Sequence, residues 1–171
     1  MTAKDMQKEF ISSYLKPTLK NHGYRTSGQT WWKSMGEFFV VINLQNSQWN
    51  SKDELSFCLN IGVALKEKLA DKEKKKASIY DVATYLREDA YLSDERQQKK
   101  KDQGGWLGYL ITDKTNLSNF IDEFKIDLEH NILKQLNGLQ TLKDCVLFYE
   151  KFIFWSDNLK REIEECGLNI N

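Results

Sequence analysis

The chain has 171 residues, of which 40% are hydrophobic, and its 25 basic residues balance its 25 acidic residues to a net charge of zero. This length suits one globular domain over 1–171, and the apolar share is large enough for a core, which argues against wholesale disorder. The zero balance gives no overall attraction to nucleic acid or anionic lipid, and no apolar run has the length of a membrane span.

The N-terminal part predicts a helix over 4–22. Met6, Phe10 and Tyr14 recur at helical spacing and would form one apolar face. Pro17 should interrupt this helix, because proline lacks the backbone N–H that a helix interior uses. Gly23 should end it as a left-handed cap.

The middle of the chain changes to a period of two, which is typical of strands. The segments "QTWWK", "EFFVVINLQ" and "ELSFCLNIGVAL" between 29 and 65 are rich in β-branched and aromatic residues. Short polar segments at 34–37 and 46–54 separate them. This pattern predicts an antiparallel meander of three strands.

Two charged segments, near 66–76 and 94–105, are expected to be flexible and solvated, the first as a loop or a short helix and the second as a loop. Replacing Lys74 or Lys100 in them with alanine should therefore change stability by no more than about 0.5 kcal/mol. The segment 78–95 between them is ambiguous between helix and strand.

The last third of the chain predicts one strand and then helices. A strand is expected over 106–112, and apolar residues at helical spacing indicate helices near 117–136, 142–152 and 156–166. The predicted fold class is therefore α+β, with an antiparallel sheet of four to five strands packed on one face by N- and C-terminal helices.

The order of several short motifs resembles a bacterial family of unknown function. These motifs are "LK…HGY" at the end of the first helix, "INLQNSQW" at 42–49 and "LNIG" at 59–62. The resemblance covers most of the chain and implies a compact α+β domain. It implies no activity and no catalytic residue.

The alternation of side chains assigns the two faces of the central hairpin. One face is apolar throughout and should form the core; it comprises Phe38, Val40, Ile42 and Leu44 with Phe57, Leu59, Ile61 and Val63. Pairing Lys33 with Phe38 would place Trp31 on the same face. The predicted register sets Asn43 opposite Asn60, within reach of a shared hydrogen bond, and Ile42 beside Ile61.

The opposite face begins with aromatic residues and continues with amides and small residues. Candidate binding residues on or beside this face are Trp32, Asn43, Gln45, Asn60 and Trp49. Amides along a trough of small residues can hold a ligand or a peptide backbone. The alternative is a solvated sheet face, where amides only stabilise neighbouring strands.

Trp49 follows a strand in a polar loop, where no strand alternation directs its side chain. It could fold back as a lid over the sheet edge, in which case its truncation should cost about 3–5 kcal/mol. Otherwise it would stay available to a partner. The lid is the favoured of these two expectations.

No catalytic motif is present, and no cofactor or metal site is predicted. His22 and His130 lie far apart in sequence, and Cys58, Cys145 and Cys166 form no metal-binding pattern. The start of the chain has no apolar signal-peptide core, which favours a cytoplasmic location.

Three functions are consistent with these features. The first is a cytoplasmic protein-recognition module, such as an inhibitor or an immunity-type protein. The second is an enzyme or small-ligand binder that uses the amide-lined face. Nucleic-acid binding through the lysine runs ranks last, because acidic residues are interleaved with them.

Overall fold

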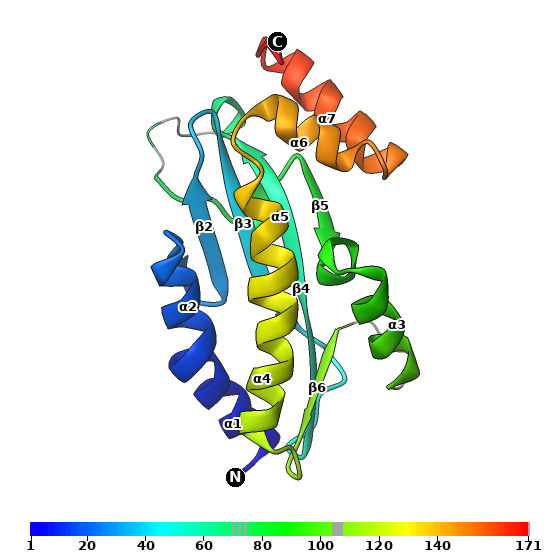
Figure 1. Cartoon of the computed structure of the whole chain (residues 1–171). Coiled ribbons are helices and arrows are strands. Elements are labelled where there is room, and N and C mark those ends of the chain that lie inside the picture. The colour runs from blue at the N-terminus through cyan, green and yellow to red at the C-terminus, as the bar shows by residue number, and fades with distance from the viewer. Residues whose placement is uncertain (70, 72, 74, 104–107, 171) are drawn as a thin grey trace.

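The computed structural model describes residues 1–69, 71, 73, 75–103 and 108–170. Within this part of the chain, one antiparallel sheet contains β1 (Arg25–Ser27), β2 (Thr30–Ser34), β3 (Phe38–Asn46), β4 (Glu54–Leu65), β5 (Thr84–Arg87) and β6 (Tyr109–Thr112). The first five strands lie in chain order, and β6 pairs with β4 (Figure 1). The predicted α+β class is confirmed, with six described strands rather than four or five.

The long strand β4 is the centre of this arrangement. One edge of β4 pairs with β3 along most of its length. The other edge pairs with two short strands: β6 pairs with Glu54–Phe57, and β5 pairs with Asn60–Val63. The two residues between these pairings, Cys58 and Leu59, have no strand partner on that edge among the described residues. This interruption matters for the site described below.

The register of the central hairpin is confirmed. Asn43 lies opposite Asn60, and Ile42 lies opposite Ile61. The preceding hairpin pairs Lys33 with Val40 and not with Phe38, a shift of two residues. A shift of two leaves every side chain on its predicted face, so Trp31 still lies on the core side and is 1% exposed.

The N-terminal helix is interrupted before Pro17. The α-helix α1 (Ala3–Phe10) passes into a π-helical turn, η1 (Ile11–Leu15), and then into α2 (Lys16–Asn21). A proline ring crowds the carbonyl four residues earlier, and a widened turn relieves that contact. The helix ends at the predicted left-handed glycine, Gly23, with φ of +88°.

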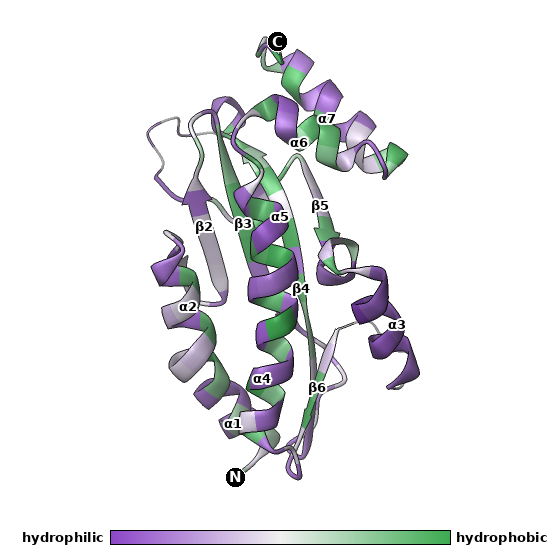
Figure 2. Ribbon diagram, in the orientation of Figure 1, coloured by the Kyte–Doolittle hydropathy of each residue, from purple (hydrophilic) through white to green (hydrophobic). Residues whose placement is uncertain are grey.

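The C-terminal helices complete the main core. The helix formed by α4 (Leu117–Asp127), η5 (Leu128–Ile132) and α5 (Leu133–Asn137) lies beside α1 and α2 over one face of the sheet (Figure 1). Green apolar stripes on these helices in Figure 2 belong to the same core as the predicted apolar face of β3 and β4. The helices α6 (Leu142–Tyr149) and α7 (Ile153–Glu165) lie at one end of the sheet.

The charged segment 94–105 differs from the expected loop. A helix, α3 (Asp94–Asp102), occupies most of it, and the Ser93 hydroxyl caps this helix by accepting from the Arg96 N–H. The sequence DERQQKKKD contains no apolar residue, so it lacks the periodicity that predicts a helix. Residues 104–107, including part of the predicted 106–112 strand, lie outside the described residues.

The other charged segment, 66–76, begins with a short 3-10 helix, η2 (Lys66–Lys68). Leu69 and Ala77 are buried against the second face of the sheet, with exposed fractions of 5% and 3%. Leu69 therefore anchors the segment, and Ala77 packs just after it, whereas most other described residues of 66–76 are exposed, as expected for a solvated loop or a short helix. Lys74 lies outside the described residues.

Candidate functional site

The aromatic end of the second sheet face is closed and not open as expected. Trp32 is 8% exposed and forms a small second core with Phe39, Val41 and Leu69. Its indole N–H donates to the backbone carbonyl of Lys75 at 2.9 Å. This hydrogen bond fastens the segment after β4 over the face, so the indole N–H is used within the protein.

The three amides on this face bond within the protein. The Asn43 amide donates to the Thr30 hydroxyl at 3.0 Å, and the Asn60 amide donates to the Gln45 side-chain oxygen at 2.8 Å. The expected hydrogen bond between Asn43 and Asn60 is therefore wrong, although the two residues are opposite each other. Asn60 is 5% exposed, and of these three amides only Gln45 lines the open part of the face.

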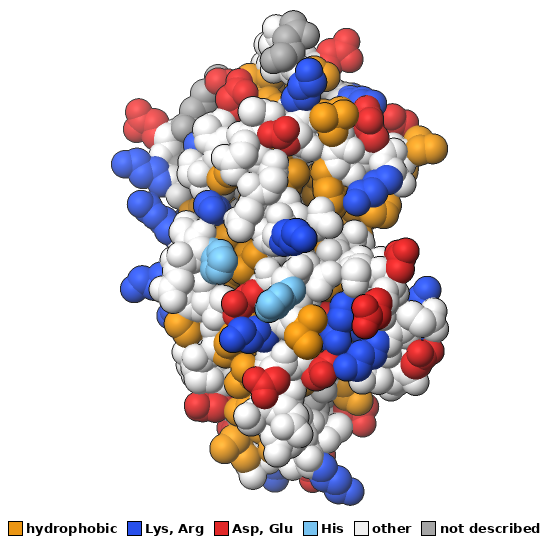
Figure 3. Space-filling view, in the orientation of Figure 1, with side chains coloured by type: hydrophobic (Ala, Val, Ile, Leu, Met, Phe, Trp, Pro, Cys, Tyr) orange, Lys and Arg blue, Asp and Glu red, His pale blue; other side chains and the backbone are white. Residues whose placement is uncertain are grey.

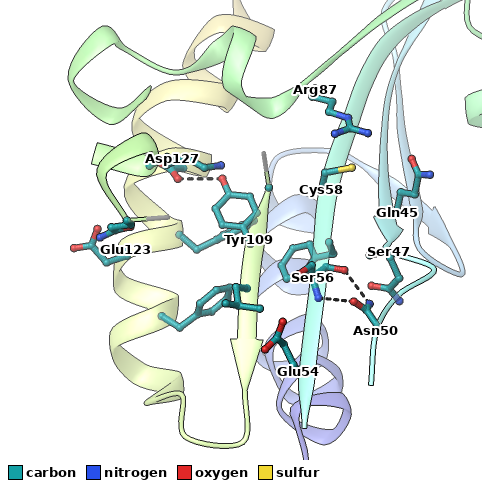
Figure 4. A pocket seen from close by; sticks show the side chains of 18 of the residues that line it. Gln45, Ser47, Asn50, Glu54, Ser56, Cys58, Arg87, Tyr109, Glu123 and Asp127 are labelled. Atoms are coloured by element: carbon teal, nitrogen blue, oxygen red, sulfur yellow. Dashed lines mark hydrogen bonds between the residues drawn. The ribbon is translucent and has the colours of Figure 1, made fainter. Parts of the chain in front are cut away.

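A half-open pocket of about 810 Å³ lies next to Gln45, at the end of the sheet where the loop between β3 and β4 is found. Its wall combines the ends of β3 and β4, the loop between them, β5, β6 and the helices α3 and α4 (Figure 4). Figure 4 shows Gln45, Ser47 and Asn50 on one side, with Cys58 and Arg87 beyond them. The pocket thus joins the amide-bearing face to segments that are far apart in sequence.

Trp49 lies on the rim of this pocket and is 85% exposed. The expectation that it covers the sheet edge as a lid is therefore wrong. Leu110, 51% exposed, lines the same pocket from β6.

The loop that carries Trp49 is held to β4 by its polar side chains. Asn50 makes two hydrogen bonds to the backbone of Ser56: it donates to the carbonyl at 2.9 Å and accepts from the N–H at 2.7 Å. The Ser47 hydroxyl accepts from the Trp49 N–H at 3.2 Å, and the Ser47 N–H donates to the Ser56 carbonyl at 2.9 Å. These four hydrogen bonds hold the loop "NSQWNS" against β4.

One wall of the pocket is a network of charged residues that the sequence did not predict. Asp127, 1% exposed, accepts from Arg96 at 2.7 Å and from the Tyr109 hydroxyl at 3.0 Å. Arg96 also pairs with Glu123 at 3.0 Å. Burial and the neighbouring Asp127 raise the pKa of Tyr109 well above its usual value, so this phenol stays protonated and donates.

A further ion pair, between Glu88 and Lys100, lies at the interruption along β4. Glu88, fully buried, accepts from the Leu59 N–H at 2.8 Å, where a strand partner is missing, and pairs with Lys100 at 3.3 Å. The Lys100 ammonium also lies 3.8 Å from the centroid of the Tyr109 ring. Desolvation raises the pKa of Glu88 despite the nearby Lys100. No sequence signal links these residues, because the contacts depend on the position of α3.

Of the carboxylates that line the pocket, Asp127 and Glu123 are paired with Arg96, whereas Glu54 is exposed and has no ion pair among the described residues. Burial and the charge of Glu88 raise the pKa of Cys58, which disfavours the reactive thiolate. His130 is exposed and His22 is half-buried, histidine side chains are visible on the face shown in Figure 3, and neither residue lines the pocket. Within the described residues, no three His, Cys, Asp or Glu side chains are grouped so that they could hold a metal ion.

Comparison with known proteins assigns the chain to a family but gives no characterised relative. No curated protein and no solved structure matches it significantly. In the described part of the chain, no helix has the length and apolarity needed to cross a bilayer. The family model described as "Domain of unknown function (DUF4304)" matches residues 15–138, which include β1–β6, the pocket network and both central hairpins, and the chain therefore belongs to the DUF4304 family.

Proposed function

We propose that this protein is a protein-recognition module of the bacterial cytoplasm, of the inhibitor or immunity type, and that its partner binds at the pocket beside Trp49. The observation that carries the proposal is the 85% exposure of Trp49 on the rim of a half-open pocket. Tryptophan is among the residues that most often contribute large binding energies in protein interfaces.

The loop that carries Trp49 supports this role. Its hydrogen bonds to the backbone of Ser56 hold it in one conformation before any partner binds. Preorganisation lowers the entropy that binding would otherwise cost. Leu110 supplies further exposed apolar surface, while Gln45 and Arg87 supply exposed polar groups. Exposed aromatic and aliphatic side chains beside polar groups are a usual composition of a protein interface.

An enzyme that uses the same face is the alternative, and it would have to rely on the exposed Glu54, because the buried carboxylates Asp127 and Glu88 are engaged. Asp127 is bonded to Arg96 and Tyr109, and Glu88 is bonded to Lys100 and Leu59. A general base must be able to reach a proton on the substrate. These two carboxylates instead hold α3 and β6 against the sheet, which is a structural use.

The Trp49→Ala variant should abolish partner capture and leave the free energy of unfolding within about 0.5 kcal/mol of the wild type. The small effect on stability is expected because the side chain is mostly exposed in the free protein. The measurement is affinity capture from native cells with mass spectrometry, followed by calorimetry with the purified partner. Urea denaturation of both proteins gives the stability.

Tyr80→Ala is the matched control, since Tyr80 is 95% exposed and does not line the pocket. It should capture the same partner as the wild type. A partner that binds the wild type and Trp49→Ala with equal affinity would show that recognition, if any, uses another surface. Equal losses in Trp49→Ala and Tyr80→Ala would indicate nonspecific aromatic adhesion.

A further inference from the structure

A second hollow, of about 790 Å³, lies at the β1–β2 end of the sheet. It is lined by Gly23, Arg25, Trp32, Lys33, Ser34, Phe39, Lys66, Glu73 and Lys75. None of these residues lines the pocket beside Trp49. Any ligand bound here would therefore be independent of the proposed protein partner.

The charge of this hollow is one-sided. Among the described residues that line it, Arg25, Lys33, Lys66 and Lys75 are basic, and Glu73 is the acidic member. Among the described residues, none of the four cations forms an ion pair; those present involve Lys68, Arg96, Lys99, Lys100 and Lys160. Because the whole chain has no net charge, this cluster is a local excess of positive charge, and a bound anion would lower its self-repulsion.

The hollow is also built on fixed parts of the fold. Lys66 donates to the Ser34 hydroxyl at 2.6 Å and lies 4.8 Å from the centroid of the Phe39 ring. The bond from the Trp32 indole to the Lys75 carbonyl holds the opposite wall to β2. The side chains of Arg25 and Lys75 are exposed, so their charged groups remain accessible from solvent.

We propose that this hollow binds a small molecule that carries two or more phosphate groups. Lysine and arginine are the main side-chain ligands of phosphate, and a single phosphate group would leave most of the four charges without a counterion. The volume lies within the range of small-molecule sites, which is roughly 300–1,000 Å³.

The test uses tripolyphosphate as the probe and isothermal titration calorimetry of the full chain at low ionic strength. The wild type should bind it, with an affinity that falls as salt is added. The double variant Arg25→Gln/Lys75→Gln should bind at least roughly tenfold more weakly, because two charge-assisted contacts are lost. Circular dichroism should show unchanged folding, since both side chains are exposed.

The matched control, Lys114→Gln/Lys134→Gln, removes the same charge at exposed positions outside the hollow and should bind tripolyphosphate as the wild type does. Absence of binding by the wild type, or equal weakening in both double variants, would overturn the proposal. So would a single-stranded oligonucleotide that competes for the same residues and binds more tightly than tripolyphosphate. Capture of a protein through Trp49 would be unaffected by any of these results.

Discussion

Replacing Glu88 with alanine should lower the free energy of unfolding by about 3–5 kcal/mol, because it breaks a buried ion pair from one side. Two groups would lose their partner at once. The Leu59 N–H would lose its acceptor at the interruption of the β4 edge. The Lys100 ammonium would lose its counterion, although its side chain is only 13% exposed. Urea denaturation of the purified variant measures the loss.

Glu164→Ala is the matched control, since Glu164 is an exposed residue of α7. It should change the free energy of unfolding by no more than about 0.5 kcal/mol. A Glu88→Ala variant as stable as this control would mean that α3 and the β4 edge do not depend on the ion pair. The double variant Glu88→Ala/Lys100→Ala should lose less than the sum of the two single variants, because the two residues interact directly.

The pH dependence of stability gives an independent check on Glu88. Desolvation raises the pKa of this carboxyl above its usual value of 4.5 in the folded protein. At a pH between the pKa of the unfolded state and the raised pKa of the folded state, the folded protein binds more protons than the unfolded chain. The stability that protonated Glu88 contributes is therefore fully present below about pH 4.5 and is lost as the pH rises through the folded-state pKa. Glu88→Gln does not titrate, so the stability of the wild type minus that of Glu88→Gln should decrease over this range. An increase with pH would mean that Lys100 outweighs desolvation.

Lys100 illustrates what could not be predicted from the sequence. Its run of charges indicated a solvated segment in which alanine would be harmless, whereas its ammonium pairs with a fully buried carboxylate and lies over the Tyr109 ring. We now expect Lys100→Ala to be strongly destabilising. Such contacts join segments with no shared periodicity, so local sequence patterns contain no information about them.

The central hairpin shows the opposite case. Apolar alternation in two adjacent strands defines a core face, and only registers that keep this face together bury Ile42 and Ile61 side by side. The pairing of the faces therefore followed from the sequence, whereas the exact register did not, because a shift of two residues, as seen between β2 and β3, keeps the same faces together. The exposure of Trp49 did not, because it depends on hydrogen bonds from Asn50 to Ser56 that a polar loop sequence does not specify uniquely.

The second large effect concerns Phe10, which is fully buried and connects α1 to both the sheet and α4. Its ring centroid lies 4.8 Å from that of Phe124, 5.2 Å from that of Phe120 and 5.8 Å from that of Phe57. These three neighbours also line the pocket beside Trp49. Removing Phe10 would therefore leave a cavity directly behind one wall of the proposed binding site.

Phe10→Ala should lower the free energy of unfolding by about 3–5 kcal/mol, the usual cost of truncating a buried aromatic residue. Phe10→Leu should cost less, because leucine fills more of the cavity. Phe154→Ala, at a position that is 66% exposed, is the matched control and should stay within about 0.5 kcal/mol. Denaturant midpoints that place Phe10→Ala beside Phe154→Ala would mean that α1 does not contribute to the core. In that case the aromatic wall of the pocket would have to be held by α4 and β4 alone.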